Sequence, residues 1–113
     1  MKITKNKSLS TNMLLQELND LLNEKFPGTI DRIILFGSRA QSNADSSSDY
    51  DILIILKSDY DWKFENKIQD VCWEIDYKYN ILTDVKIISK HELSQLRGKQ
   101  LYILHALDKG ITV

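Results

Sequence analysis

The sequence is poor in several residue types, and each shortage excludes a class of protein. Its single cysteine, Cys72, rules out an intrachain disulfide and any metal site built from several thiolates. One proline and four glycines in 113 residues argue against long disordered stretches, which are rich in these residues. The apolar runs Ile33–Phe36 and Ile52–Leu56 are far shorter than the about 20 residues that a membrane helix needs.

The chain also lacks an excess of charge of one sign and an apolar segment at its start. Its formal net charge is −1, so we expect no membrane association and no direct nucleic-acid binding. Residues 1–10 are polar, which is not the pattern of a signal peptide. Hydrophobic residues make up 42% and charged residues 27%, as in ordinary globular proteins. We therefore expect one compact domain, residues 1–113, in a reducing cytoplasm.

Leucines at helical spacing predict an amphipathic first helix. Ser10 or Thr11 is placed to cap its start, and Pro27-Gly28 is expected to end it. Short apolar runs rich in β-branched residues then predict three buried strands, at Ile30–Phe36, Tyr50–Leu56 and Ile81–Ile88.

Helical patterns separate and follow these strands. Apolar residues at helical spacing predict a helix from about Asp61 to Tyr79. Ser89 and Glu92 have the spacing of a capping box, so another helix should begin there, and Gly98 should break it. A last short helix, with Gly110 as its C-cap, is marked by Leu101, Leu104 and Leu107. The order predicts an α/β domain, with a small mixed sheet of about three strands flanked by helices.

Two aspartates, Asp49 and Asp51, stand where the second predicted strand begins. Residues i and i+2 of a strand point to the same face, so the two carboxylates should lie side by side. Such a pair repels unless a cation balances it, and Mg²⁺ commonly binds one or two carboxylates together with substrate phosphates. Taken alone, the pair also fits a frayed strand end with two solvated aspartates, and Asp45 fits one more loop charge.

A third acid, Asp84, interrupts the third apolar run. An aspartate in the middle of a strand is disfavoured unless it has a function. Two interpretations carry equal weight here. If the third strand neighbours the second, Asp84 joins Asp49 and Asp51 around one site; otherwise Asp84 pairs with Lys86 or lies on an exposed face of the sheet.

The first predicted strand ends in Gly37-Ser38. A glycine at this point lets the backbone turn sharply and approach a ligand, and the amide N–H groups that follow can cradle phosphate oxygens. The Ser38 hydroxyl adds a donor. Arg39 is a further candidate for holding a phosphate, with an ion pair to a loop acid such as Asp45 as its alternative. Gly-Ser alone is also typical of an ordinary turn.

Together these residues form a longer pattern, because ten residues separate Gly37-Ser38 from the Asp49-x-Asp51 that opens the next strand. With Asp84 in the strand beyond a helix, the pattern resembles the signature of the minimal nucleotidyltransferases of the DNA polymerase β superfamily. The order of elements also resembles that family from about Ile30 onward. Further positions that resemble it are Arg39-Ala40, Ser48 and Leu107–Ile111. Ser42 departs from the pattern, since members often have glycine there.

The resemblance implies a nucleotidyltransferase fold and a Mg²⁺-dependent enzyme. Such an enzyme transfers a nucleoside monophosphate from a nucleoside triphosphate, by default ATP, to an acceptor hydroxyl. By resemblance, Asp49 and Asp51 hold two Mg²⁺ ions, and Asp84 binds the acceptor-side metal and assists deprotonation of the attacking hydroxyl. The nucleotide-binding residues that the resemblance implies are Gly37, Ser38, Arg39 and Ser48.

The resemblance also implies a partner. Members of this family are commonly encoded with a small helical protein, a HEPN-type ribonuclease toxin, and some adenylylate it. The chain would then be the antitoxin of a toxin–antitoxin pair. Its single-domain size and its aromatic content are also compatible with a homo- or hetero-oligomer. Aromatic residues are numerous, and we expect most of them to be core or half-buried; they are Trp62, Trp73, Tyr50, Tyr60, Tyr77 and Tyr102.

One other function stays open, and a second is disfavoured by the length of the chain. The chain is alternatively a binding module that neutralises such a partner by occlusion, with catalysis weak or lost, although the intact acids do not indicate a loss. An antibiotic-modifying nucleotidyltransferase would need a drug-binding domain for which 113 residues leave no room. Outside the pattern, we expect His91 and His105 to be structural or exposed and Cys72 to be an inert core thiol.

Overall fold

Helices and strands follow one another in the predicted order in the computed structural model, which describes residues 10–37, 39–40, 49–95 and 100–113. The helices are α1 (Thr11–Lys25), α2 (Trp62–Tyr79), α3 (Lys90–Leu93) and α4 (Leu101–Lys109). The strands are β1 (Ile30–Phe36), β2 (Tyr50–Leu56), β3 (Thr83–Ser89) and β4 (Ile111–Thr112). The α/β prediction is confirmed. The expected strand number is corrected from about three to four, because a two-residue strand shows no periodicity of its own.

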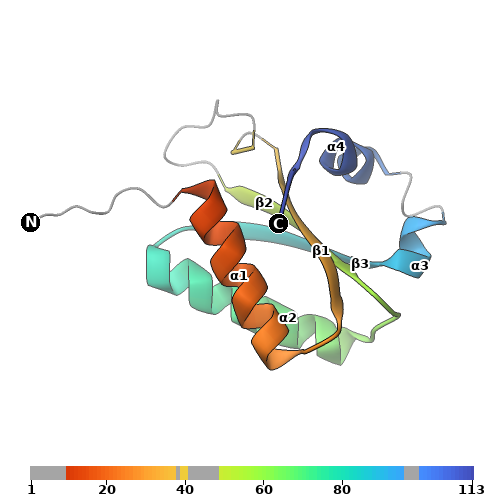
Figure 1. Cartoon of the computed structure of the whole chain (residues 1–113), viewed down its shortest axis with the longest axis horizontal. Coiled ribbons are helices and arrows are strands. Elements are labelled where there is room, and N and C mark those ends of the chain that lie inside the picture. The colour runs from red at the N-terminus through yellow and green to blue at the C-terminus, as the bar shows by residue number, and fades with distance from the viewer. Residues whose placement is uncertain (1–9, 38, 41–48, 96–99) are drawn as a thin grey trace, which may run out of the picture.

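The four strands form one mixed sheet in the order β3-β2-β1-β4. β1 pairs antiparallel with both β2 and β4, whereas β2 and β3 run parallel. A parallel pair needs a crossover connection, and here α2 supplies it (Figure 1). Because of this crossover, β2 and β3 both begin at the same end of the sheet.

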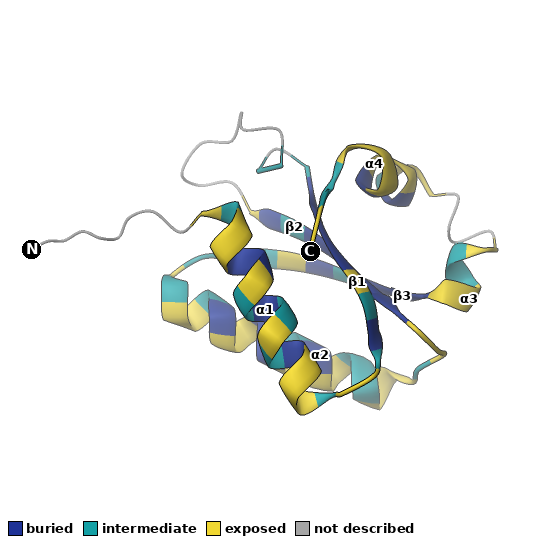
Figure 2. Cartoon of the chain, in the orientation of Figure 1, coloured by how far each residue is buried: buried dark blue, intermediate teal, exposed yellow. Residues whose placement is uncertain are grey.

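Helices lie on both faces of the sheet. α1 and α2 pack on one face and α4 packs on the other. Alternate strand residues enter the two cores, so Ile33 faces α1 and α2, while its neighbour Ile34 faces α4. Figure 2 shows buried bands on the inner sides of α1 and α2 and exposed residues on their outer sides. No described helix combines the length and the apolar character that crossing a membrane requires.

Side-chain caps begin two of the helices where the sequence predicts them. Of the two candidate caps of α1, Ser10 is the one used, because its hydroxyl accepts a hydrogen bond of 3.1 Å from the Met13 N–H. The capping box of Ser89 and Glu92 at the start of α3 is present. The break predicted at Gly98 lies outside the described residues.

The third strand begins at Thr83, two residues later than predicted. Asn80 ends α2 with a left-handed backbone, φ 53°, which starts to turn the chain. Asp76 then accepts hydrogen bonds from the Thr83 N–H at 3.3 Å and from the Thr83 hydroxyl at 2.8 Å. Ile81 and Leu82 therefore belong to the connection, and Leu82 is exposed.

The last helix forms where three leucines predict it, but it uses other residues to pack. Ile103 and Ala106 are its buried residues. The leucines lie on its outer side and are exposed; they are Leu101, Leu104 and Leu107. Gly110 is the C-cap as predicted, and a side chain there would collide with Ile34. The glycine thus lets the chain pass close to β1, where β4 pairs.

Candidate active site

Three aspartates gather where β2 and β3 begin. Asp49 precedes β2 and is exposed, whereas Asp51 is the second residue of β2 and is half-buried. In the parallel register of β2 and β3, Asp51 lies opposite Asp84. Both side chains share the face of the sheet on which α4 packs, because Asp51 alternates with Ile52 of the other core. The adjacency of strands on which a shared site depends is therefore present.

The Asp51 carboxylate is in an environment that disfavours its charge. Burial raises the pKa of Asp51 most, and the negative charges of Asp84 and Asp49 raise it further. The positive charge of Lys86 acts in the opposite direction and lowers this pKa. A carboxylate in such surroundings gains from a nearby cation, which offsets both desolvation and repulsion.

Gly37 makes room for Asp51. Its φ of 74° is in the left-handed region that glycine adopts without strain. A Cβ at this position would overlap Oδ2 of Asp51 and stand 3.2 Å from its Cγ. Any side chain at residue 37 would therefore displace the carboxylate. The sequence predicts close approach of a ligand to this backbone, and the structure shows close approach of Asp51.

Lys86 lies two residues beyond Asp84, on the same face of β3. The distance from Lys86 Nζ to Asp84 Oδ1 is 3.0 Å, and the two side chains are 43% and 48% exposed. Asp84 therefore both pairs with Lys86 and lies opposite Asp51, two arrangements that are alternatives from the sequence alone. Among the described residues, no three His, Cys, Asp or Glu side chains lie in an arrangement that could hold a metal ion.

Arg39 stacks on an aromatic ring at the start of β2, on the face of the sheet that packs against α1 and α2 and not on the face of Asp51. Its guanidinium carbon is 4.2 Å from the ring centroid of Tyr50, which is buried at the start of β2. The contact places a cationic side chain next to the strand that carries Asp51. Two further predicted nucleotide-binding residues, Ser38 and Ser48, lie outside the described residues, as does Asp45.

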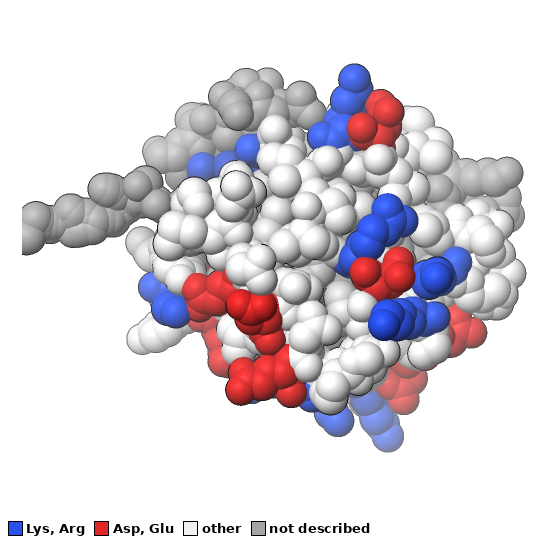
Figure 3. Space-filling view, viewed as in Figure 1, with Lys and Arg blue, Asp and Glu red and all other residues white. Residues whose placement is uncertain are grey.

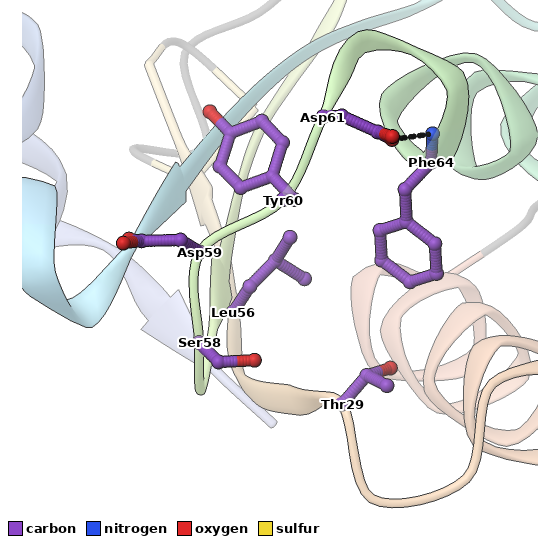
Figure 4. A pocket seen from close by; sticks show the side chains of 7 residues that line it. All are labelled: Thr29, Leu56, Ser58, Asp59, Tyr60, Asp61 and Phe64. Atoms are coloured by element: carbon purple, nitrogen blue, oxygen red, sulfur yellow. Dashed lines mark hydrogen bonds between the residues drawn. The ribbon is translucent and has the colours of Figure 1, made fainter.

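A hollow of about 480 Å³ lies at the other end of β2, about 16 Å along the strand from Asp51. Its lining residues are Thr29, Leu56, Ser58, Asp59, Tyr60, Asp61 and Phe64. Figure 4 shows Asp61 turned toward the Phe64 backbone nitrogen, whose N–H donates to it at 2.9 Å. Asp59 in turn accepts a hydrogen bond from Ser89. The carboxylates of Asp59 and Asp61 therefore have hydrogen-bond partners within the local structure.

Cys72, His91 and His105 are not part of the candidate site. Cys72 is buried, and burial, with a smaller effect of Asp76, raises the pKa of its thiol to about 12. The His91 side chain is 62% exposed and lies 3.4 Å from Asp59, and His105 is exposed.

The expectation for the aromatic residues is half right. Tyr50 is buried, and Tyr60 and Tyr102 are partly buried. The other three are exposed: Trp62, Trp73 and Tyr77. Their side chains occur on the outer side of α2, where apolar spacing alone does not distinguish an inner from an outer aromatic residue.

The fold and the site define a class of protein, an α/β domain that sets carboxylates on adjacent strands beside a glycine turn. The family model described as polymerase beta, nucleotidyltransferase, matches residues 16–110. The chain therefore belongs to this family of nucleotidyltransferases, and the predictions of family fold and enzyme class are confirmed.

Two curated relatives come from Methanocaldococcus jannaschii, and each is named "Putative protein adenylyltransferase". The first is 30% identical over 96 residues, which cover 85% of this chain and 90% of the relative. The second is 35% identical over 75 residues, which cover 66% of this chain and 72% of the relative. The similarity thus spans most of each protein.

Proposed function

We propose that this chain is a protein adenylyltransferase that uses Mg²⁺ and transfers AMP from ATP to a hydroxyl group of a partner protein. The observation that carries the proposal is the register of Asp51 opposite Asp84, beside the Gly37 turn. The names of the two relatives supply the choice of AMP and of a protein acceptor. The family supplies the reaction type.

The chemistry of the acids fits Mg²⁺. Carboxylate oxygens are the donors that this ion prefers, and the raised pKa of Asp51 marks a position where a cation is favourable. Asp49 and Asp51 would hold two ions, with Asp84 as the further ligand on the acceptor side. When bound, the metal neutralises the triphosphate and stabilises the charge that develops during transfer.

The residues of the chain would then have distinct tasks. The acceptor oxygen forms a bond to the α-phosphorus, the bond to the bridging oxygen breaks, and pyrophosphate leaves. Asp84 takes the proton of the attacking hydroxyl. The backbone turn at Gly37 and the side chains of Ser38 and Ser48 bind the phosphates. Arg39, which stacks on Tyr50, would bind a phosphate oxygen, a role that the family resemblance implies.

Exposed aromatic side chains support a protein acceptor. Trp62 is 67% exposed, Trp73 66% and Tyr77 92%. At helical spacing these three residues fall within about 60° of one another around α2. Trp73 and Tyr77 are about one turn apart, and Trp62 lies on the same side about three turns earlier. Exposed aromatic residues are enriched in interaction surfaces. The proposal extends to a small helical partner of the HEPN type in a toxin–antitoxin pair.

The distribution of charge bears on the choice of acceptor. Figure 3 shows lysine and arginine side chains in small separate groups on one face, with an acidic group over α1. On this face, the described side chains do not merge into a continuous basic patch of the kind that binds nucleic-acid phosphates. This face thus gives no indication of a nucleic-acid acceptor.

The proposal is tested by ATP binding in the presence of Mg²⁺, measured by calorimetry. We expect Asp51→Asn to reduce the affinity at least about tenfold, because it removes a charged metal ligand. Asp20→Asn is the matched control, since Asp20 is an exposed acid of α1 away from the strands. Wild-type affinity in the Asp51 variant would show that the site lies elsewhere.

Transfer itself is tested with ATP labelled in the α-phosphate and a co-encoded helical protein. Label should enter that protein with the wild type and not with Asp51→Asn. If the Asp51 variant still neutralises the partner without labelling it, occlusion is the function and adenylylation is not.

A further inference from the structure

A lysine lies among the acids of the candidate site. Lys86 Nζ is 3.0 Å from Asp84 Oδ1, on the strand next to Asp51. Its charge also lowers the pKa of Asp51, against the opposite effects of Asp84 and Asp49. One ammonium group therefore acts on carboxylates of two adjacent strands.

We propose that Lys86 competes with the acceptor-side divalent ion for Asp84, and so sets the metal affinity of the site. The inference rests on the proposed function, because it concerns the same acids. Asp84 Oδ1 accepts a hydrogen bond from Lys86, and that oxygen cannot at the same time face a metal ion from the same direction. A nearby ammonium also repels a divalent cation.

The geometry of the described residues agrees with such competition. Asp84 lies opposite Asp51, yet no three described acids, histidines or cysteines form an arrangement that could hold a metal ion. One oxygen of the Asp84 carboxylate, Oδ1, is bonded to Lys86. Release of the lysine frees this oxygen as a ligand.

The competition lowers the metal affinity without blocking the site. Both side chains of the ion pair are about half exposed, at 43% and 48%. Ion pairs exposed to this degree are weak, because water screens them, so a divalent ion can displace the lysine. A divalent ion that displaced the ammonium would be held by Asp84, as the proposed function requires.

The test is a titration with Mn²⁺ alone, followed by electron paramagnetic resonance of the free ion. Mn²⁺ is a suitable probe because it prefers the same carboxylate oxygens as Mg²⁺. Lys86→Met should bind Mn²⁺ about tenfold more tightly than the wild type, which corresponds to a divalent ion and a unit charge about 6 Å apart in water. Lys86→Arg keeps the charge and should retain the wild-type affinity.

Two further variants control for net charge and for the ligand. Lys90 follows β3 at its far end and pairs with Asp31 at 3.9 Å, so Lys90→Met removes the same charge without touching Asp84. We expect this variant to bind Mn²⁺ as the wild type does. Adding Asp84→Asn to Lys86→Met should cancel the gain in affinity. Denaturant unfolding of each variant confirms that the differences do not reflect lost structure.

The outcomes separate the inference from the proposed function. Equal Mn²⁺ affinity in wild type and Lys86→Met, lost in Asp51→Asn, overturns the role of Lys86 and leaves the metal site intact. An equal gain in Lys90→Met also overturns it, since net charge alone would then explain the effect. If no variant binds Mn²⁺, with or without ATP, the inference and the proposed metal site both fail.

Discussion

Replacing Gly37 by alanine should lower activity by moving Asp51, at a modest cost in stability. A residue other than glycine in the left-handed region costs about 1–2 kcal/mol, so at φ 74° the free energy of unfolding should fall by that amount. The new Cβ overlaps Oδ2 of Asp51 and stands 3.2 Å from its Cγ, so the carboxylate must move. A displacement of roughly 1 Å in a reacting site lowers the rate about 100-fold.

The chain contains a matched control for this variant. Gly28 has φ 76°, and a Cβ there would meet nothing within 4 Å. Gly28→Ala therefore has the same backbone cost as Gly37→Ala but leaves every side chain in place. A lower ATP affinity or transfer rate in Gly37→Ala than in Gly28→Ala therefore reports the displacement of Asp51.

Denaturant unfolding measures the stability of both variants, and ATP binding with Mg²⁺ and the rate of AMP transfer measure the site. Both should lose about 1–2 kcal/mol, a fall of several degrees in Tm. Only Gly37→Ala should lose ATP affinity and transfer. If Gly37→Ala binds and transfers as well as Gly28→Ala, the close approach of Gly37 to Asp51 has no role in the site, and the reasoning is refuted.

Three other properties follow from the described surroundings of single residues. Because the pKa of Asp51 is raised above its ordinary value of 3.8, its charge destabilises the folded protein at neutral pH, so in EDTA Asp51→Asn should be more stable than wild type. The extra free energy of unfolding of Asp51→Asn over wild type should be complete above the raised pKa of Asp51 and disappear by pH 3.8. A stability difference that stays constant with pH would contradict this explanation. Tyr50→Leu should weaken ATP binding roughly two- to fivefold by removing the ring that supports Arg39, while Tyr50→Phe keeps the wild-type affinity. Cys72, with a pKa of about 12, should react with iodoacetamide at pH 8 only in denaturant; fast labelling of the folded protein would show that the thiol is accessible.

Most of the fold could be predicted from the sequence where a pattern is local. β1 and β2 have the predicted bounds, because each is a short apolar run followed or preceded by polar residues. The start of β3 could not be predicted, since it depends on the contact between Asp76 and Thr83, seven residues apart, across the end of α2. β4 depends on pairing with β1 and has no signal of its own.

The candidate site could be predicted in composition but not in arrangement. The spacing of Asp49 and Asp51 indicates a shared face, yet the position of Asp84 opposite Asp51 depends on the pairing of β2 with β3. Sequence spacing also leaves the partner of Asp84 undecided between Lys86 and the other acids. The contact of Gly37 with Asp51 is between the end of β1 and the neighbouring strand β2, and no pattern within one strand indicates it.

The parallel pairing of β2 and β3 also has a consequence for the order of folding events. Asp51 and Asp84 lie on either side of the whole of α2, so they meet only when that long chain segment has closed. Closure brings like charges together and must be driven by burial of neighbours such as Ile54 and Ile87. The carboxylates thus come together only when this non-local pairing has formed. A cation bound between Asp51 and Asp84 would stabilise the pairing of β2 with β3 and slow the separation of the two strands.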